Sequence, residues 1–336
     1  MNKLADDCFN QVEDLMSMSQ ALEILQQRIV IVTGDRLDRL PLARATGRIL
    51  AENMVSVIDV PPHDNSAVDG YALRHEDLSQ HTKTTLLIQG RSAAGHPYDG
   101  ELAPGQCIRI FTGAVMPSGA DSIVMQEDVV ACNGAITIPS RLKLGANRRL
   151  QGEDNKAGDI ALKRGQRLRP QDLGLAASVG HGELTVYRPL RVGVFSTGDE
   201  LTEPGDALSD GAVYDANRHI LMSLITGLGA EVSDLGILPD KATAVREGLS
   251  TAAKDQDLLL TSGGVSVGNE DYVRDAVEAL GHLHFWRLAI KPGRPLALGQ
   301  VGDTAFVGLP GNPVAVSYTH LRAHETEADL VCRLLL

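Results

Sequence analysis

The stretch "DLLLTSGGVSVGNEDY", residues 257–272, decides the fold and raises the first question about function. It joins an apolar run that is typical of the end of a buried strand to a turn with two adjacent glycines. Such a turn suits an oxyanion, because bare backbone N–H groups can approach the anion closely. Glu270 and Asp271 follow in the same loop. Carboxylates suit an anion site only when a divalent cation lies between them and the anion, so the stretch leaves open what its loop binds.

Strand-like and helix-like segments alternate before this stretch. "LRVGVFSTGDEL" (190–201) and "AEVSDLGIL" (230–238) read as strands, whereas "NRHILMSLITGLG" (217–229) and "DKATAVREGLSTAAKD" (240–255) read as helices. This alternation predicts a doubly wound α/β domain with a parallel sheet and with ligands at the carboxyl ends of its strands. The turns "STGDE" and "TSGGVS" both follow such ends.

The first half of the chain has a different character. Between residues 73 and 138, short apolar runs alternate with Gly, Pro and Asn turns, which predicts a small β domain. Ser17 and Gln20 have capping-box spacing and predict the start of an amphipathic helix, and residues 40–56 read as a second short helical unit that leads into an extended piece. We expect a linker domain at 1–60 and 140–188, an inserted β domain at 61–139 and the α/β domain at 189–315.

Composition limits the class of protein. The chain has 336 residues and a net charge of −12, which argues against a general nucleic-acid binder. Its four cysteines show neither CxxC spacing nor a disulfide framework, which indicates a reducing cytoplasm. The N-terminus lacks the features of a secretory signal, and no apolar run is long enough to span a membrane.

Three further clusters each allow two interpretations. "PPHDNSAVDGYA" (61–72) gathers Asp64, Asn65 and Asp69, which are typical both of turn chemistry and of a site. "RRLQGED" (148–154) is either a solvated charged loop or a binding loop. "FSTGDEL" (195–201) is either a helix cap or the end of a site-bearing strand.

Cations follow farther along the chain. Arg287, Lys291 and Arg294 come after a strand and would face the same end of the sheet as the glycine turn, which makes an oxyanion pocket. "GLPGNP" (308–313) is a rigid loop of the kind that positions other groups. The chain lacks the patterns of a His/Cys metal site, a Ser or Cys nucleophile, a P-loop and a dinucleotide fingerprint.

Taken in order, these motifs resemble one known family. "DNSAVDGYA", "IFTGAVMP", "GED", "FSTGDEL", "TSGGVSVGNEDY", "AIKPGRP" and "GLPGNP" occur as in the molybdopterin molybdenumtransferase (MoeA) family, which includes the C-terminal region of gephyrin. The resemblance implies a Mg²⁺-dependent transferase that inserts molybdate into adenylylated molybdopterin and releases AMP. It also implies an elongated homodimer, with a cleft between the α/β domain of one chain and the β domain of the other. Molybdopterin adenylyltransferase would be the upstream partner.

Matching by position carries the family's site residues onto this chain. The implied catalytic residues are Asp69, Thr112, Asp154, Glu200, Asp271 and Lys291. The implied substrate-binding residues are Arg149, Ser262, Gly263, Gly264, Ser266, Arg287, Pro310 and Pro313. The implied metal ligands are Glu200, Asp240 and Asp271. Arg287 stands where many relatives carry Lys, so a planar fork replaces a point charge.

Two other functions remain open at this stage. A molybdopterin adenylyltransferase would share the fold of the second half, but the inserted β domain argues against a single-domain enzyme of that kind. A binding or scaffold role belongs to gephyrin's related region, but this sequence has no long partner-binding linker.

The last residues depart from the family pattern. Residues 316–326 resemble a reading frame of a sequencing adapter, and residues 330–336 resemble the adapter's constant region. We therefore expect 316–336 to be a non-native tail and the family's C-terminal β domain to be missing. The alternative is a natural short helix, in which His320 and His324 would lie one turn apart.

Overall fold

The chain divides into two units in the computed structural model, and each unit is described by itself. One unit combines Met1–Asp38 with Tyr187–Leu336, and the other is Arg39–Val186. The structure describes residues 16–17, 19–21, 23, 36–79, 81–138, 141–264, 272–287 and 295–313. The predicted tail at 316–336 lies outside these ranges. Among the described residues, Ser17 and Gln20 exchange the reciprocal hydrogen bonds of the predicted capping box.

The first unit is built on a six-stranded sheet with the order β16-β13-β17-β20-β19-β18. The strands are β13 (Arg191–Thr197), β16 (Glu231–Leu238), β17 (Leu258–Ser262), β18 (Gly281–Arg287), β19 (Pro295–Val301) and β20 (Thr304–Leu309). Strands β16, β13, β17 and β20 are mutually parallel, as predicted. Strands β18 and β19 extend the sheet in antiparallel pairing, an edge that the sequence pattern did not indicate.

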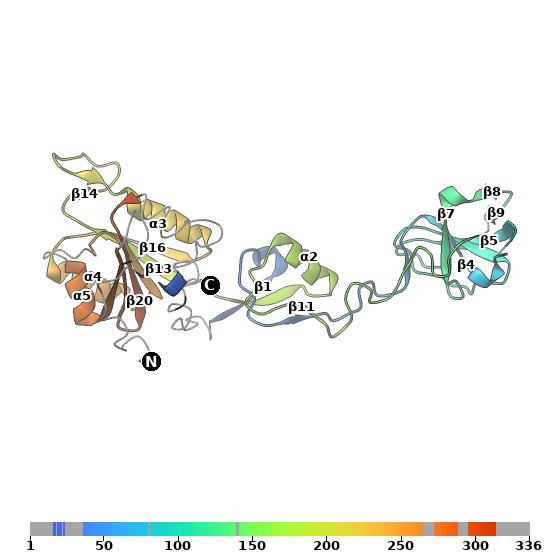
Figure 1. Cartoon of the computed structure of the whole chain (residues 1–336), viewed down its shortest axis with the longest axis horizontal. Helices are drawn as coiled ribbons and strands as arrows, with labels where there is room; N and C mark the ends of the chain where they lie inside the picture. The colour runs from blue at the N-terminus through green and yellow to red at the C-terminus, as the bar shows by residue number, and fades with distance from the viewer. Residues whose placement is uncertain are drawn as a thin grey trace. The chain divides into compact units, whose positions relative to one another are not determined.

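Helices cover both faces of this sheet (Figure 1). They are α3 (Ala216–Gly227), α4 (Ala242–Ala252) and α5 (Tyr272–Leu280). Leu221 and Ile225 of α3 pack with Val192, Val194 and other residues of one sheet face. Residues of α4 and α5 pack with Phe195 and Leu259 on the opposite face. The doubly wound arrangement is therefore confirmed, because successive residues of β13 and β17 bury their side chains against different helices.

The second unit contains a β domain with a six-stranded sheet in the order β7-β4-β6-β5-β9-β8. Its strands are β4 (Gly70–Leu73), β5 (Thr84–Ser92), β6 (Gln106–Ile110), β7 (Ser122–Met125), β8 (Val130–Cys132) and β9 (Ala135–Ile138). The predicted apolar runs form these strands, and two clusters of buried side chains fill the domain. Burial raises the pKa of the Cys107 thiol to about 12, so this thiol stays protonated at neutral pH.

The rest of the second unit is held by short strands and one helix. They are β1 (Leu37–Pro41), β2 (Met54–Val55), β3 (Asn65–Ser66), β10 (Arg148–Arg149), β11 (Ile160–Leu162), β12 (Glu183–Tyr187) and α2 (Pro170–Ser178). The short helical unit expected within 40–56 forms only as the 3-10 turn Leu42–Arg44, because Gly47 follows it with φ +77°. The extended piece expected after it forms as β2.

A buried carboxylate fixes the beginning of β17. Asp257 pairs with Arg36 at 2.6 Å and with Arg191 at 3.2 Å, and it accepts a hydrogen bond from the Arg191 backbone N–H. Burial raises the pKa of Asp257, but the hydrogen bonds from Arg36 and Arg191 outweigh burial and leave the pKa below its usual value.

This lowered pKa gives a pH dependence with a definite sign. The stabilisation from Asp257 is complete above the unfolded-state pKa of about 3.9 and is lost as pH falls through the lower folded-state pKa. We expect Asp257→Asn to lower the free energy of unfolding at pH 7 by about 1.5–3 kcal/mol and to reduce the acid-induced loss of stability. Urea titrations from pH 7 to pH 3 measure both effects. An unchanged acid response in the variant would contradict this prediction.

Candidate functional site

The carboxyl ends of the parallel strands meet at one edge of the α/β sheet. Thr197 ends β13 opposite Leu238 of β16, and Ser262 ends β17 opposite Leu309 of β20. The backbone of Arg287 pairs with Pro295 at the same edge, and the direction predicted for its side chain lies outside the described residues. Asp240 and Pro310 lie just beyond β16 and β20. The sheet therefore gathers the backbone of several predicted site residues at the edge where α/β proteins bind ligands.

The glycine turn after β17 has a shape that only glycine permits. The backbone N–H of Gly263 donates to Leu309 at 2.9 Å, and Gly264 has φ +64°. A Cβ on Gly264 would lie 2.9 Å from methyl groups of Thr197 and Val273. The two glycines thus let the chain turn tightly against β13 and α5 while its backbone remains bare.

Asn217 on α3 joins this turn to the rigid loop after β20, and sequence reasoning missed it. Its Nδ2 donates to Ser262 Oγ at 2.7 Å and to the Gly311 carbonyl at 2.7 Å. Ser262 Oγ also lies 3.5 Å from the Pro310 carbonyl. One amide group therefore fixes two predicted substrate-binding segments. The only signal in the sequence was a short polar residue in the first turn of a predicted helix.

Polar oxygens near this edge lack hydrogen-bond partners within the described part of the chain. They are Ser196 Oγ, Thr261 Oγ1 and Asn217 Oδ1, and all three atoms are buried. Buried polar groups are normally paired, and an unpaired one calls for an explanation such as a water or a ligand. The described residues supply no such partner for these three oxygens.

Two predicted metal ligands lie at the ends of neighbouring strands. The carboxylate of Glu200 folds against Gly198, where a Cβ would lie 2.5 Å from Glu200 Oε2, and Gly198 has φ +147°. Asp240 accepts a hydrogen bond from Thr197 Oγ1 at 3.2 Å. The described residues contain no group of three or more His, Cys, Asp or Glu side chains that could hold a metal. Two carboxylates nevertheless fit Mg²⁺, which commonly takes one or two protein carboxylates and completes its shell with substrate oxygens.

A buried arginine organises the start of α3. Arg218 is 1% exposed, and its Nε donates to Asp215 Oδ2 at 2.8 Å. Its other guanidinium nitrogens donate to Asp234 on β16 and to Glu203. Glu203 follows β14 (Leu201–Thr202), which begins directly after Glu200. Arg218 therefore ties the Glu200 loop, the helix and the sheet together, and sequence reasoning gave it no role.

We predict that Asn217→Ala loosens the glycine turn. The variant loses two hydrogen bonds that each contribute about 0.5–1.5 kcal/mol, so the Gly263 amide should exchange its hydrogen at least about 10-fold faster. Amide hydrogen exchange read by mass spectrometry measures this effect. Ser223→Ala is the matched control, because Ser223 is exposed on the same helix and should leave the turn unchanged. Equal protection in the two variants would show that Asn217 does not hold the turn.

In the second unit, the predicted residues Asp69 and Thr112 form a direct pair. Asp69 Oδ1 accepts hydrogen bonds from the Thr112 backbone N–H and from Thr112 Oγ1, both at 2.8 Å. These two hydrogen bonds hold the pKa of Asp69 below its usual value, and the bond from the Thr112 backbone N–H contributes more than the bond from its hydroxyl. Asp69 is therefore an anion throughout the neutral range. Both hydrogen bonds from Thr112 end on Oδ1, so Oδ2 accepts neither of them.

The predicted residues Arg149 and Asp154 form a second pair in this unit. Arg149 Nη2 lies 2.5 Å from Asp154 Oδ1, and Arg149 Nε lies 3.5 Å from Glu153 Oε1. Strand β10 pairs Arg149 with Asn65 of β3, and Ala114 accepts a hydrogen bond from the Ser66 backbone. The segment that precedes Asp69 thus lies between the segments that carry Thr112 and Arg149. No hydrogen bond or ion pair between described residues joins the two pairs.

The remaining predicted residues fall where little can be described. Ser266, Asp271 and Lys291 lie outside the described residues, and the side chain of Arg287 does as well. The proposed metal and oxyanion ligands among them stay predictions. Pro310 follows β20 directly, and Pro313 is helical three residues further on.

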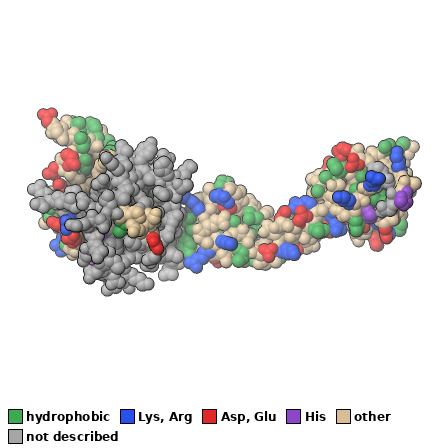
Figure 2. Space-filling model, viewed as in Figure 1, with side chains coloured by type: hydrophobic (Ala, Val, Ile, Leu, Met, Phe, Trp, Pro, Cys, Tyr) green, Lys and Arg blue, Asp and Glu red, His purple; other side chains and the backbone are tan. Residues whose placement is uncertain are grey.

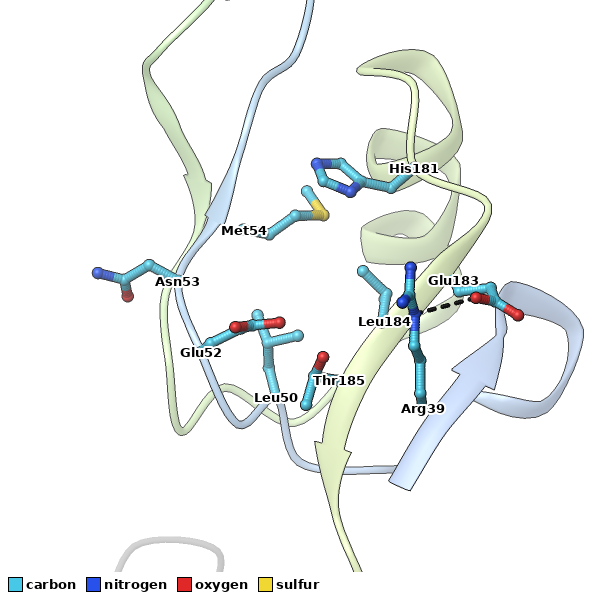
Figure 3. Close-up of a pocket in the computed structure, with 9 residues that line it drawn as sticks. All are labelled: Arg39, Leu50, Glu52, Asn53, Met54, His181, Glu183, Leu184 and Thr185. Atoms are coloured by element: carbon cyan, nitrogen blue, oxygen red, sulfur yellow. Dashed lines mark ion pairs between the residues drawn. The ribbon is translucent and has the colours of Figure 1, made fainter. Parts of the chain in front are cut away.

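The second unit also contains a cavity of about 290 Å³ that none of the predicted site residues lines (Figure 3). Leu50, Met54 and Leu184 form its apolar wall, and Arg39 pairs with Glu183 at 3.0 Å beside it. On the face shown in Figure 2, basic and acidic side chains of described residues are interspersed. None of the described helices is both long and apolar enough to cross a membrane.

Comparison with known sequences and structures gives the class of protein. Residues 16–180 match the family described as "MoeA N-terminal region (domain I and II)", and residues 193–322 match "Probable molybdopterin binding domain". A structure of the molybdopterin biosynthesis MoeA protein from Pyrococcus horikoshii OT3 is similar with a TM-score of 0.80 and 30% identity. That similarity covers 96% of this chain and 80% of the other.

Curated relatives make the assignment specific. The molybdopterin molybdenumtransferase of Haemophilus influenzae is 43% identical over 91% of this chain and 75% of its own length. The enzyme of the same name from Nostoc is 39% identical over 83% of this chain and 65% of its own length. The chain belongs to the molybdopterin molybdenumtransferase family, and its function lies in the biosynthesis of the molybdenum cofactor.

Proposed function

We propose that this chain inserts molybdate into adenylylated molybdopterin and releases AMP, with Mg²⁺ as the required metal. The observation that supports this proposal best is the position of the glycine turn after β17. Asn217 and Leu309 hold this turn at the same sheet edge as the Glu200 and Asp240 segments. A bare turn beside carboxylates suits two anionic substrates and one divalent cation.

In the α/β unit, the proposed roles follow the chemistry of each group. In the turn that begins at Ser262, the Gly263 N–H already donates to Leu309, so the later backbone N–H groups, together with Lys291 and Arg287, hold the oxygens of molybdate or of the phosphoanhydride. Pro310 and Pro313 shape the loop that Asn217 fixes through Gly311. Gly263, Gly264 and Ser266 keep the turn open to the anion.

Glu200, Asp240 and Asp271 are the proposed holders of Mg²⁺. When bound there, the cation supplies charge neutralisation and polarises the phosphoryl group. The protein's own contribution is to orient the Glu200 carboxylate, through Gly198 and through the ion pair between Glu203 and Arg218.

The second unit contributes Asp69, Thr112, Arg149 and Asp154 in this proposal. Asp69 is held as an anion by Thr112, and Arg149 is oriented by Asp154. We place these residues opposite the α/β unit of a partner chain in a homodimer. The reaction follows that of a molybdopterin adenylyltransferase in a reducing cytoplasm, because an adenylylated substrate must come from an adenylyl-transfer step.

AMP release tests the proposed reaction. The purified full chain is incubated with adenylylated molybdopterin, molybdate and Mg²⁺, and AMP is separated by chromatography. We expect AMP to form in the complete mixture and to fall to background when molybdate or Mg²⁺ is omitted. AMP formation that ignores both omissions, or no AMP in any mixture, would refute the proposal.

Mixing variants tests the shared site separately. Asp69→Ala and Glu200→Ala are each expected to be inactive alone, and the control is each variant mixed with itself. If the site forms between chains, co-refolded mixtures recover activity, because some dimers then contain one intact site. Mixtures as inactive as the single variants would show that the site does not form between chains.

A further inference from the structure

Two arginines share one aromatic ring on the β domain. Arg91 and Arg109 both place their guanidinium carbons 4.8 Å from the centroid of the Phe111 ring. Arg109 also lies 4.9 Å from the Tyr71 ring centroid. The register explains the cluster, because Arg109 is the partner of Tyr71 on β4 and of Arg91 on β5. The four side chains thus form a row across neighbouring strands.

The positive charge of this row is partly offset by Asp69, whose carboxylate attracts Arg109, whereas Arg91 has no charged partner among the described residues. Arg109 donates to the Gly70 carbonyl at 3.0 Å and to Gln126, which are both uncharged. Arg91 is exposed and makes no hydrogen bond or ion pair with a described residue. Each guanidinium carbon lies 4.8 Å from the Phe111 centroid, so the two carbons can be at most twice that distance apart. Like charges at such a separation repel each other. An anion that binds between or beside the two guanidinium groups would offset this repulsion.

The row lies next to the pair already described. Thr112 follows Phe111 directly, and Asp69 precedes β4. Asp69 is the one carboxylate in this pair, its Oδ1 is engaged by Thr112 and its charge interacts with Arg109, so the row of two guanidinium groups still carries an excess positive charge. The Phe111 ring lies against both guanidinium groups, so an oxyanion would meet them edge-on, at the N–H groups of Arg91 and at those of Arg109 that Gly70 and Gln126 do not engage.

We propose that Arg91 and Arg109, supported by Phe111, form a binding subsite for a tetrahedral oxyanion beside Asp69 and Thr112. The ligand class is a phosphate group of the nucleotide substrate or molybdate itself, which share charge and shape. This inference rests on the proposed function for the identity of the substrate, but the binding itself does not depend on turnover.

Chemical modification tests the subsite without an activity readout. Phenylglyoxal labels exposed arginines, and peptide mass spectrometry follows each residue in the full chain. We expect inorganic pyrophosphate or molybdate to slow the labelling of Arg91 several-fold, while Arg44, which is also exposed, is labelled at an unchanged rate. Protection by one probe alone identifies the source of the anion. Labelling of Arg91 that neither probe changes would overturn the proposal.

Kinetics separates a failed subsite from a failed function. If pyrophosphate protects Arg91, Arg91→Gln should raise the KM for the nucleotide substrate about 10-fold and leave kcat unchanged. If molybdate protects it, the KM for molybdate should rise instead. Lys83→Gln is the matched control, because Lys83 is exposed just before β5, at the other end of that strand. AMP release with an unchanged KM in Arg91→Gln would sink the subsite alone. Protection of Arg91 without any AMP release would sink the proposed function alone.

Discussion

Replacing Arg218 with alanine is expected to lower the free energy of unfolding of the α/β unit by about 3–5 kcal/mol. The guanidinium is 1% exposed and donates to Asp215, Asp234 and Glu203. Its removal leaves the buried Asp215 carboxylate without its cation. Equilibrium unfolding in urea, followed by circular dichroism, measures the loss.

Two variants give this prediction its controls. Arg218→Lys keeps the charge but loses the planar fork, so its stability should fall between those of the native chain and Arg218→Ala. Arg274→Ala removes a half-exposed arginine that pairs with Glu278 on α5, and it should cost at most about 1 kcal/mol. A loss in Arg218→Ala no larger than that in Arg274→Ala would contradict the role given to the network.

Gly70→Ala is expected to prevent the β domain from folding. A Cβ at this position would lie 2.1 Å from the Val124 carbonyl oxygen, which belongs to the backbone of β7. Strand β4 is paired with β6 on one side and β7 on the other, so it cannot move away without breaking a ladder. We expect a loss of more than about 4 kcal/mol, with rapid proteolysis of residues 61–139 as the measurement.

Gly174→Ala is the matched control for this prediction. Gly174 lies within helix α2, and a Cβ there meets no atom within 4 Å. The substitution should raise stability by about 0.5–1 kcal/mol, because alanine loses less backbone entropy in a helix than glycine does. A β domain that resists proteolysis equally well in both variants would contradict the close approach at Gly70.

Much of the fold could be predicted because local patterns and tertiary structure agree. The buried run before Thr261 became the central strand β17, and the alternation of strands and helices became a doubly wound sheet. The antiparallel edge of β18 and β19 could not be predicted, since a short apolar strand looks the same in either direction. The helical unit expected within 40–56 is shorter than its apolar spacing suggested, because Gly47 with φ +77° ends it after one 3-10 turn.

The residues of the candidate site could likewise be predicted only in part. Asp69, Thr112, Arg149 and Asp154 could be named from the motifs one by one, whereas their pairing, Asp69 with Thr112 and Arg149 with Asp154, emerges only from the structure. Asn217 and Arg218 escaped prediction, because their partners Ser262, Gly311 and Asp234 are distant in sequence and meet them only through the fold. The metal-binding roles of Glu200, Asp240 and Asp271 stay predictions.

The measurement that tests the central claim most directly counts AMP and pterin-bound molybdenum in the same reaction. The full chain, adenylylated molybdopterin, molybdate and Mg²⁺ are combined, and the two products are quantified after separation. The account predicts equal molar amounts that rise together with time. AMP without molybdenum on the pterin would contradict it, because such a chain would hydrolyse the nucleotide without transferring the metal.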